Sequence, residues 1–141
     1  MKNELTVSFP AISRNESLAR GIAAQFACLL DPTVEELSDI RTAVSEAVTN
    51  AVIHGYGGRG GNIVMKLESG DDLLTVSVID EGRGIEDVEL ARTPFYTTMP
   101  EAERSGLGFA VMEAFMDRVS VDSAPGRGTT VTMQKRIMRD D

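Results

Sequence analysis

Two polar side chains have the types and the spacing that phosphate chemistry requires. Glu46 and Asn50 are four residues apart in the segment Ser45-Glu-Ala-Val-Thr-Asn50, so on a helix they lie one turn apart on the same flank. An Asn amide oxygen is a hard, neutral ligand suited to Mg²⁺. A carboxylate one turn away can accept the proton of an attacking hydroxyl. Taken alone, the pair is more typical of an ordinary solvated helix face.

A second candidate segment, Asp80-Glu-Gly-Arg-Gly-Ile85, follows directly on an apolar stretch that is typical of a buried strand. A carboxylate at the end of such a strand is costly unless it has a partner, and Asp80 can accept a hydrogen bond from the exocyclic amine of adenine. Gly82 and Gly84 allow the chain to turn sharply and to pass close to a flat ring. An ordinary β-turn is the alternative interpretation of this segment.

Two further segments are rich in glycine. Ser105-Gly-Leu-Gly-Phe109 enters a predicted helix, where free backbone N–H groups and the helix dipole make an anion site. Arg104, just ahead, can reach a γ-phosphate and neutralise developing charge. In Gly126-Arg-Gly-Thr-Thr130, Thr129 can present its hydroxyl to the edge of adenine. The alternatives are a loop capped by Ser105 and a plain hairpin turn.

The elements that must position these residues follow from the periodicity of the apolar positions. Asn15 is a candidate N-cap, and Thr33 with Glu36 makes a capping box. The expected apolar face of the first helix is Leu18, Ile22, Phe26 and Leu29. The pattern predicts strand 5–9, helices 15–30 and 33–54, a turn at 55–61, strands 63–67 and 73–79 around a turn at 70–72, a lid-like loop at 86–104, helix 108–117, and strands that begin at 119 and 129. This order predicts a single α+β domain over residues 1–141, a two-layer sandwich with helices on one face of a mostly antiparallel sheet.

Composition limits the classes of function. The chain has 141 residues and a net charge of −8, which argues against direct nucleic-acid binding because that requires a basic surface. The single cysteine, Cys28, cannot form an internal disulfide, so a reducing compartment is expected. We interpret Cys28 as a small buried hydrophobe. The N-terminus does not open a signal peptide, and no apolar run approaches the ~20 residues of a membrane span. We therefore expect a cytoplasmic protein with no membrane contact.

Together and in this order, the four segments resemble the N, G1, G2 and G3 boxes of the GHKL ATPase superfamily (gyrase, Hsp90, histidine kinase, MutL). The resemblance covers residues from about 5 to 135. The stretches Ser-Glu-Ala-Val-Thr-Asn-Ala-Val-Ile-His-Gly-Tyr and Glu-Arg-Ser-Gly-Leu-Gly-Phe are most similar to the serine-kinase anti-sigma branch of that superfamily.

The resemblance implies a role for each matching residue. Glu46 would be the base toward a serine hydroxyl, Asn50 would hold Mg²⁺, and Arg104 would act on the phosphates. Residues 92–105 would form the ATP lid. The implied contacts to ATP are Asn50, Asp80, Gly82, Gly84, Ile85, Thr97, Thr98, Ser105, Gly106, Leu107, Gly108, Phe109 and Thr129.

The resemblance also implies partners. A homodimer would bind a sporulation sigma factor and phosphorylate a serine of a small anti-anti-sigma protein. Glu16 and Arg20 on the first helix are candidates for the partner surface, although a simple i,i+4 pair explains them equally well. A relative of the general stress type, and a binding module that uses nucleotide without transferring phosphate, are the alternative functions.

Two residues distinguish this chain within the resemblance. Met99 stands where the family pattern has a Lys, which removes one cation from the predicted lid. His54 is the only histidine. A two-component histidine kinase would carry its phosphoacceptor His on a separate helical hairpin, so we interpret His54 as a cation at the end of the helix or a hydrogen-bonded structural residue.

Overall fold

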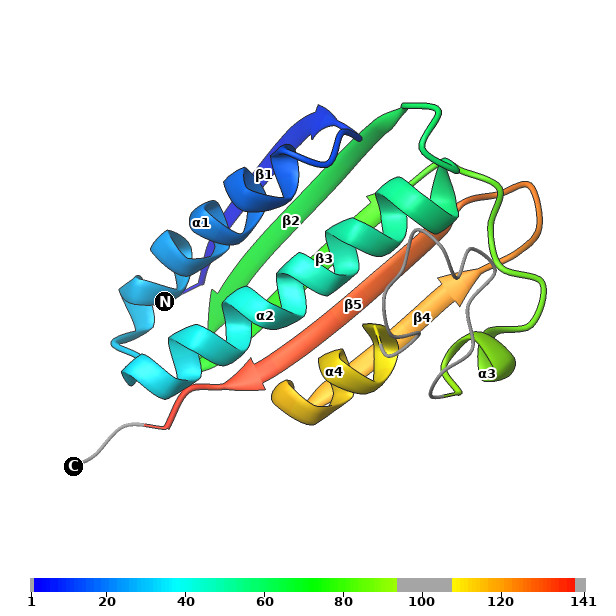
Figure 1. Ribbon diagram of the computed structural model, residues 1–141. Coiled ribbons are helices and arrows are strands. Elements are labelled where there is room, and N and C mark those ends of the chain that lie inside the picture. Colours follow the sequence, from blue (N-terminus) through cyan, green and yellow to red (C-terminus); the bar gives the residue numbers. More distant parts are fainter. Residues whose placement is uncertain (1, 94–107, 139–141) are drawn as a thin grey trace.

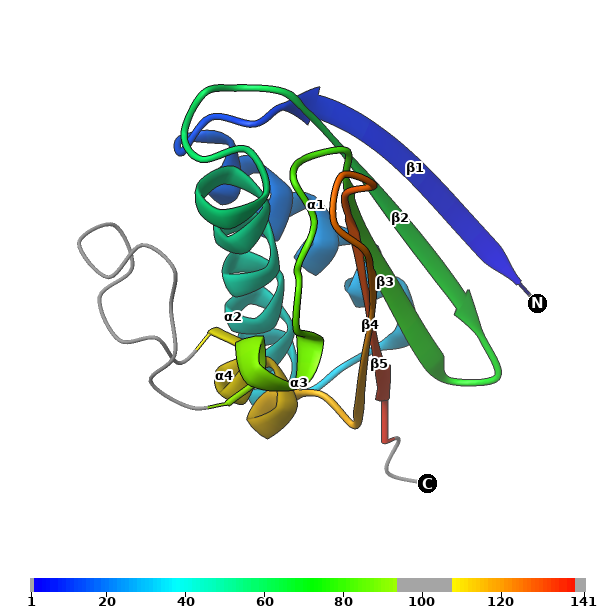
Figure 2. The same ribbon diagram turned by 90° about the vertical axis from the view of Figure 1, so that its right-hand side faces the viewer.

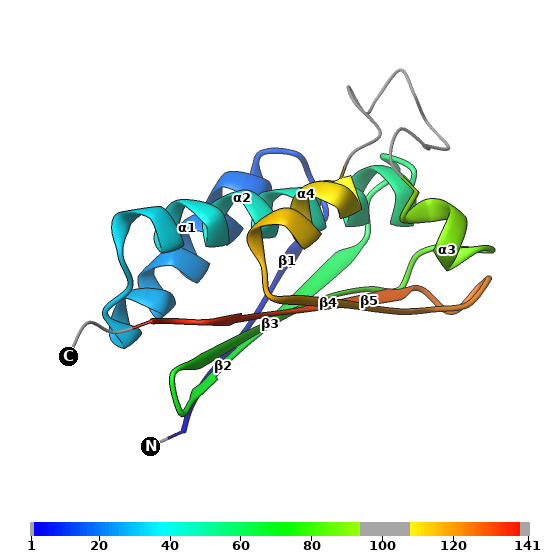
Figure 3. The ribbon, with the colours of Figure 1, turned by 90° about the horizontal axis from the view of Figure 1, so that it is seen from below.

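The computed structural model describes residues 2–93 and 108–138, and these form two layers (Figure 1). One layer is a five-stranded antiparallel sheet in the order β1-β2-β3-β5-β4. The helices α1, α2 and α4 lie together on one face of that sheet, as Figures 2 and 3 show from two further directions. The strands are β1 Asn3–Pro10, β2 Asn62–Gly70, β3 Leu73–Asp80, β4 Arg118–Ser123 and β5 Thr129–Arg136. The helices are α1 Asn15–Ala27, η1 Cys28–Leu30, α2 Val34–Asn50, η2 Ala51–Gly55, α3 Val88–Ala91 and α4 Gly108–Phe115. The predicted α+β sandwich is confirmed.

Alternate side chains along the central strands are buried and form the core, and on two of these strands the buried position at one end is a predicted site residue. Leu74, Val76 and Val78 are buried on β3, and the next residue of the same parity is Asp80. On β5 the first buried residue of the alternating pattern is Thr129, which is paired with Asp80 in the register of the two strands. Because alternate residues of a strand share a face, Asp80 and Thr129 lie on the same face as the core, where it reaches the end of the sheet.

The buried face of α1 differs from the expected one. Leu18 is 51% exposed and Leu29 is 63% exposed, so the prediction that both face the core was wrong. The helix instead packs through Phe26 and small side chains, namely Ala19, Ala23, Ala24 and Ala27. Alanines allow α1 to approach its neighbours closely. The spacing of the large apolar residues alone does not predict this packing.

Both ends of α1 also depart from expectation. The residue before the helix is Arg14, and Asn15 is its first residue; the side-chain amide of Asn15 donates to the carbonyl oxygen of Pro10 at 2.9 Å. At the other end the chain tightens into the 3₁₀ turn η1, which leaves Cys28 exposed and buries Leu30 instead. The interpretation of Cys28 as a buried residue was therefore wrong.

Three smaller differences concern loops and one helix. The lid-like loop expected from residue 86 contains α3, which begins where the Asp87 carboxylate accepts from the Leu90 N–H at 3.0 Å. The β2–β3 turn consists of Asp71 and Asp72 alone, with φ of 52° and 63°, as tight hairpins require. On α4, Phe115 is partly exposed rather than packed with the other apolar residues.

The capping box of α2 is confirmed and yields a test of stability. The Glu36 N–H donates to Thr33 Oγ1 at 3.1 Å, and the Thr33 N–H donates back to Glu36 Oε1 at 2.9 Å. Glu36 Oε2 also accepts from the Met138 N–H at 3.0 Å. Burial acts to raise the pKa of Glu36, but these hydrogen bonds outweigh it and lower the pKa below its ordinary value of 4.5.

We expect Glu36→Gln to lower the free energy of unfolding by about 1 kcal/mol at pH 7, because glutamine has one acceptor oxygen and cannot accept from both the Thr33 and the Met138 N–H groups. A depressed carboxyl pKa contributes stability above the unfolded pKa and loses it as pH falls through the folded pKa. The deficit of the variant should therefore shrink below pH 4.5. Urea unfolding of both proteins at several pH values measures it, and a deficit that does not change with pH would contradict the ionic contribution.

Candidate active site

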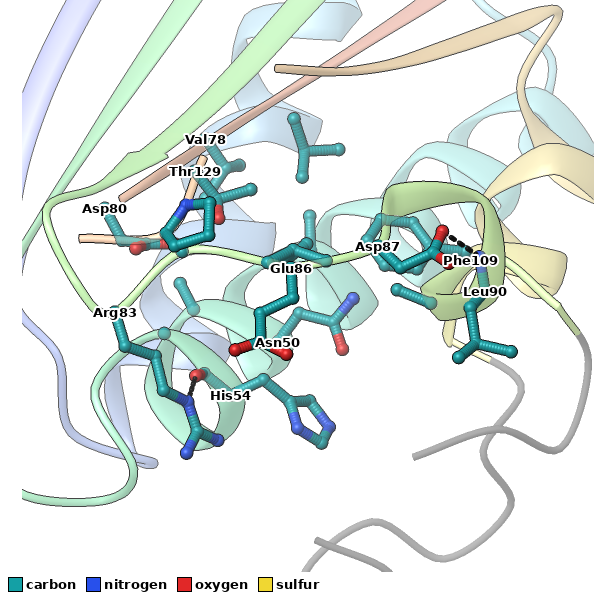
Figure 4. A pocket seen from close by; sticks show the side chains of 18 residues that line it. Asn50, His54, Val78, Asp80, Arg83, Glu86, Asp87, Leu90, Phe109 and Thr129 are labelled. Carbon is teal, nitrogen blue, oxygen red and sulfur yellow. Dashed lines mark hydrogen bonds between the residues drawn. The ribbon is translucent and has the colours of Figure 1, made fainter. Parts of the chain in front are cut away.

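A pocket of about 380 Å³ opens at the end of the sheet, between α2, η2, the chain after β3 and the start of β5 (Figure 4). Its walls bring together residues that are up to 84 positions apart in the sequence, as from Ala47 to Val131. Six of the residues expected to contact ATP line it: Asn50, Asp80, Gly84, Ile85, Phe109 and Thr129. Four separate segments of the chain therefore converge on one cavity.

Asp80 supplies a buried carboxylate to this pocket. The residue is 6% exposed, and its Oδ1 accepts from the Gly82 N–H at 2.9 Å. Burial raises the pKa of Asp80 and is stronger than the hydrogen bonds from the backbone of Gly82 and Thr129, which lower it. A carboxylate held in this way is a strong acceptor that is still short of solvation, so a ligand N–H donor is favoured there.

Glycines near Asp80 are required by the packing of the protein itself. A Cβ on Gly82 would lie 2.0 Å from the Gly55 carbonyl oxygen, and one on Gly55 would lie 2.8 Å from the Asp80 carboxylate. Gly84 has a φ of +76° and its Cβ would meet the Ala124 carbonyl oxygen at 2.0 Å. Gly84 lines the pocket, whereas Gly82 does not. Gly82 thus serves close backbone packing against η2, and its predicted contact with ATP stays a prediction.

Thr129 is fixed by a small hydroxyl network. Its Oγ1 lies 2.8 Å from Ser123 Oγ, which donates to the Gly128 carbonyl oxygen at 2.9 Å and accepts from the Ile85 N–H at 2.8 Å. Because the single Ser123 proton goes to Gly128, Thr129 must donate to Ser123, which leaves the Thr129 oxygen as an acceptor. Ser123 was missed in the sequence because it fits an ordinary strand position.

Asn50 is the last residue of α2, and its side chain points into the pocket (Figure 4). Its amide nitrogen is buried and has no hydrogen-bond partner within residues 2–93 and 108–138. A buried polar group without a partner costs about 1–3 kcal/mol, so this amide is suited to a ligand. A half-turn of the amide exchanges its nitrogen for its oxygen, the atom that can hold Mg²⁺.

The part of the chain that the structure describes contains no group of three or more His, Cys, Asp or Glu that could hold a metal ion. A Mg²⁺ ion at this site would therefore depend on Asn50, on water and on ligand phosphates, which is the usual way in which proteins hold Mg²⁺ with nucleotides. The residues fit Mg·ATP in this respect.

Glu46 lies one turn before Asn50 but faces elsewhere. It lines a second, polar groove of about 570 Å³ at the junction of α1 and α2, together with Ser17, Arg20 and Ser45. The groove therefore places Glu46 beside the pocket and not inside it.

Of the two candidate partner residues, Arg20 lines the same groove and Glu16 is paired with it. Arg20 Nη1 lies 3.5 Å from Glu16 Oε1, which confirms the expected i,i+4 pair. Glu16 also accepts a hydrogen bond from the hydroxyl of Ser45 on α2, a contact that the sequence did not predict. The pair is thus attached to the helix that carries Glu46 and Asn50.

His54 also lines the pocket, and it lies in η2 rather than at the end of a continuous α-helix. The turn η2 is a π-helix, in which the Tyr56 N–H donates to the carbonyl oxygen of Ala51, five residues back, at 3.0 Å. Such turns occur often at functional sites. No local pattern in the sequence predicts this turn.

Several predicted residues lie outside the described part of the chain. These are Thr97, Thr98, Met99, Arg104, Ser105, Gly106 and Leu107, with most of the predicted lid. Gly108 and Phe109 open α4 and are both buried. The roles in phosphate binding remain predictions, as does the homodimer.

Comparison with known proteins identifies the family. The chain matches the histidine kinase-like ATPase domain over residues 9–135. It is 51% identical over 140 residues to the anti-sigma F factor of Bacillus licheniformis, an alignment that covers 99% of this chain and 96% of that protein. It is 52% identical over 138 residues to the anti-sigma F factor of Thermoanaerobacter sp. strain X514 (98% and 96%), and 50% identical over 140 residues to that of Bacillus subtilis strain 168 (99% and 96%).

Within the described ranges no helix has both the length and the apolar character needed to cross a bilayer. The antiparallel sheet with helices on one face is the architecture expected of the GHKL group. From the match over most of its length and from the identity to these proteins, the chain belongs to the anti-sigma F factor family and carries a histidine kinase-like, ATP-binding domain of the GHKL type.

Proposed function

We propose that this protein is an anti-sigma factor and a protein-serine kinase, which binds Mg·ATP in the pocket between α2 and the end of the sheet. The observation that carries this proposal is the convergence of Asn50 and Asp80, from separate elements, on one cavity of about 380 Å³. One residue offers an unsatisfied amide and the other a buried carboxylate. Those are the two groups that a metal–nucleotide complex needs at its opposite ends.

The adenine end is supported by the acceptors around Asp80. The carboxylate accepts from the exocyclic amine of adenine, and the Thr129 hydroxyl oxygen is oriented by Ser123 as a second acceptor nearby. Two acceptors side by side favour a donor amine, such as the exocyclic amine of adenine, over a carbonyl at this position. Ile85 and Phe109 supply apolar surface for the ring.

The phosphate end lies toward Asn50 and the N-terminus of α4. The side-chain oxygen of Asn50 would hold Mg²⁺, which neutralises charge on the phosphates when it is bound. Arg104 and the backbone of residues 105–109 are proposed to contact the phosphates, since glycines at a helix N-terminus expose N–H groups.

Phosphate transfer is proposed to use Glu46 as the base. The serine oxygen of the partner forms a bond to the γ-phosphorus while the bond from that phosphorus to the bridging oxygen of ADP breaks. The serine proton passes to the Glu46 carboxylate, and ADP leaves. The position of Glu46 in the α1–α2 groove supports this role because a protein segment can approach it there.

The partners are proposed from the names of the relatives and from the groove. Three relatives are named anti-sigma F factors, and we propose that this protein likewise binds a sigma factor, as a homodimer. The acceptor of the phosphate would be a serine of an anti-anti-sigma protein. Arg20 lines the groove with Glu46, and Glu16 contacts Arg20 and Ser45 of that groove, which supports their assignment to the partner surface.

The proposal is tested most directly through Asn50. We expect Asn50→Ala to weaken Mg·ATP binding about 10- to 100-fold, the range for loss of one polar contact to a charged ligand. Binding of ATP in excess EDTA should change much less, since the residue acts through the metal. Isothermal titration with and without Mg²⁺ measures both affinities. Ser38→Ala, on the exposed face of the same helix, is the matched control and should bind as the wild type does. Equal losses with and without Mg²⁺ would contradict the metal role.

A further inference from the structure

Arg83 joins the segments that form one wall of the pocket. Its backbone N–H donates to the Gly55 carbonyl oxygen at 2.9 Å, and its side-chain Nε donates to the His54 carbonyl oxygen at 2.6 Å. Its own carbonyl oxygen accepts from the Gly126 N–H at 2.8 Å. One residue therefore connects η2, the chain after β3 and the β4–β5 hairpin, as the dashed contact in Figure 4 shows in part.

The π-turn explains why an arginine suits this position. The last carbonyl groups of a helix have no partner within it. Two of those in η2, at His54 and Gly55, are both satisfied by Arg83. The C-terminal end of a helix also carries partial negative charge, which favours a guanidinium group. The side chain of Arg83 thus caps the turn that follows Asn50.

The position of η2 affects the geometry of the pocket because η2 is in tight contact with the chain around Asp80, at the proposed adenine end. A Cβ on Gly55 would contact the Asp80 carboxylate at 2.8 Å, and a Cβ on Gly82 would contact the Gly55 carbonyl oxygen at 2.0 Å. If the turn moved away, the wall beside Asp80 would open and the Gly82 N–H that holds its carboxylate would shift with it. The cap on η2 therefore controls the geometry around Asp80.

We propose that Arg83 is a positioning residue of the nucleotide pocket, which holds η2 against Asp80 and Gly82 without touching the phosphates. The expected effect of Arg83 on ligand affinity rests on the proposed binding of ATP. The expected effect of Arg83 on η2 does not depend on any ligand, so the positioning role and the proposed function can fail separately.

The ligand-free test uses amide hydrogen exchange in the whole protein. The Tyr56 and Gly58 N–H groups donate to the carbonyl oxygens of Ala51 and Val52, both at 3.0 Å. In Arg83→Ala we expect both amides to exchange about tenfold faster, as loss of a charged hydrogen bond predicts. The amide of Met65, in β2, should not change. Unchanged exchange at Tyr56 and Gly58 would overturn the inference, whatever the protein binds.

The ligand test compares adenosine, ADP with Mg²⁺ and ATP with Mg²⁺. Because the cap acts on the wall at the adenine end, Arg83→Ala should weaken all three by a similar factor, about five- to tenfold. A loss confined to ADP and ATP would show that Arg83 contacts phosphate, and would overturn the positioning role. If the wild type bound none of the three, the proposed function would fail while the exchange result stood.

Two further variants keep the test interpretable. Arg127→Ala removes the same charge from an exposed position on the neighbouring hairpin, outside the pocket lining, and should leave both measurements unchanged. Arg83→Lys keeps a cationic donor without the rigid planar group, and should show a smaller, still uniform loss of about two- to threefold. It serves as the test if Arg83→Ala does not fold, and unchanged values for both exchange and affinity would then contradict the proposal.

Discussion

Glu46→Gln should slow phosphate transfer to the serine of the partner protein about 100- to 10,000-fold, the contribution typical of a general base. Glutamine has the size of glutamate but cannot accept the proton of the attacking hydroxyl. Because Glu46 lines the α1–α2 groove and not the nucleotide pocket, the affinity for Mg·ATP should remain close to that of the wild type. Single-turnover transfer of labelled γ-phosphate, with calorimetry for binding, measures the two quantities separately.

Glu35→Gln provides the matched control, since Glu35 is an exposed carboxylate on the same helix and lies outside both cavities. It removes the same charge and should leave transfer at the wild-type rate. Full transfer by Glu46→Gln would show that another group is the base. A wild type that binds ATP but labels no serine would favour the alternative function, a nucleotide-dependent binding module without kinase activity.

The order of the elements could be predicted because local patterns and tertiary packing agree in most of this chain. Leu74, Val76 and Val78 alternate as a half-buried strand requires, and the Thr33–Glu36 box marks the start of α2. The same patterns predicted most of the site, since Asp80 follows an apolar stretch and Asn50 lies one helical turn after Glu46. Their meeting in one pocket followed from the family resemblance more than from spacing.

The remaining features depend on contacts between distant segments, which no local pattern encodes. Leu18 is exposed because α1 packs through its alanines. The π-turn η2 exists where Arg83, almost 30 residues later, caps its carbonyl groups. Ser123 joins Ile85 to Thr129 across two loops. In each case at least one partner lies far along the sequence, so no local pattern signals the contact.

Asp80→Asn should weaken ligand binding and raise the stability of the ligand-free protein. The charged carboxylate favours binding but disfavours folding. Two backbone N–H groups, of Gly82 and Thr129, already donate to Asp80, and adenine would add a third donor. An asparagine side chain has only one acceptor oxygen and directs its NH₂ group at one of these donors. We therefore expect ATP and adenosine to bind about 10- to 100-fold more weakly, as calorimetry with each ligand would measure.

The same variant should be more stable than the wild type at pH 7 without ligand. Burial raises the pKa of Asp80 above its ordinary value of 3.8, so the folded state favours the neutral carboxyl. A raised carboxyl pKa gives stability that is fully present below the unfolded pKa and is lost as pH rises through the folded pKa. Asparagine is neutral at every pH and avoids that loss. The advantage of the variant should therefore vanish as pH is lowered toward 3.8 and grow again toward neutrality.

Urea unfolding of the two proteins across this pH range, without nucleotide, tests the sign of the effect. Glu36 and the other carboxylates titrate in both proteins, so the difference between the curves isolates Asp80. A variant less stable than the wild type at pH 7 would mean that the bonds from Gly82 and Thr129 outweigh burial, and that the carboxylate has a structural role. Greater stability with unchanged affinity would place adenine elsewhere. Only the combination of higher stability and weaker binding fits a carboxylate that is kept, at a cost to the fold, for the amine of a nucleotide.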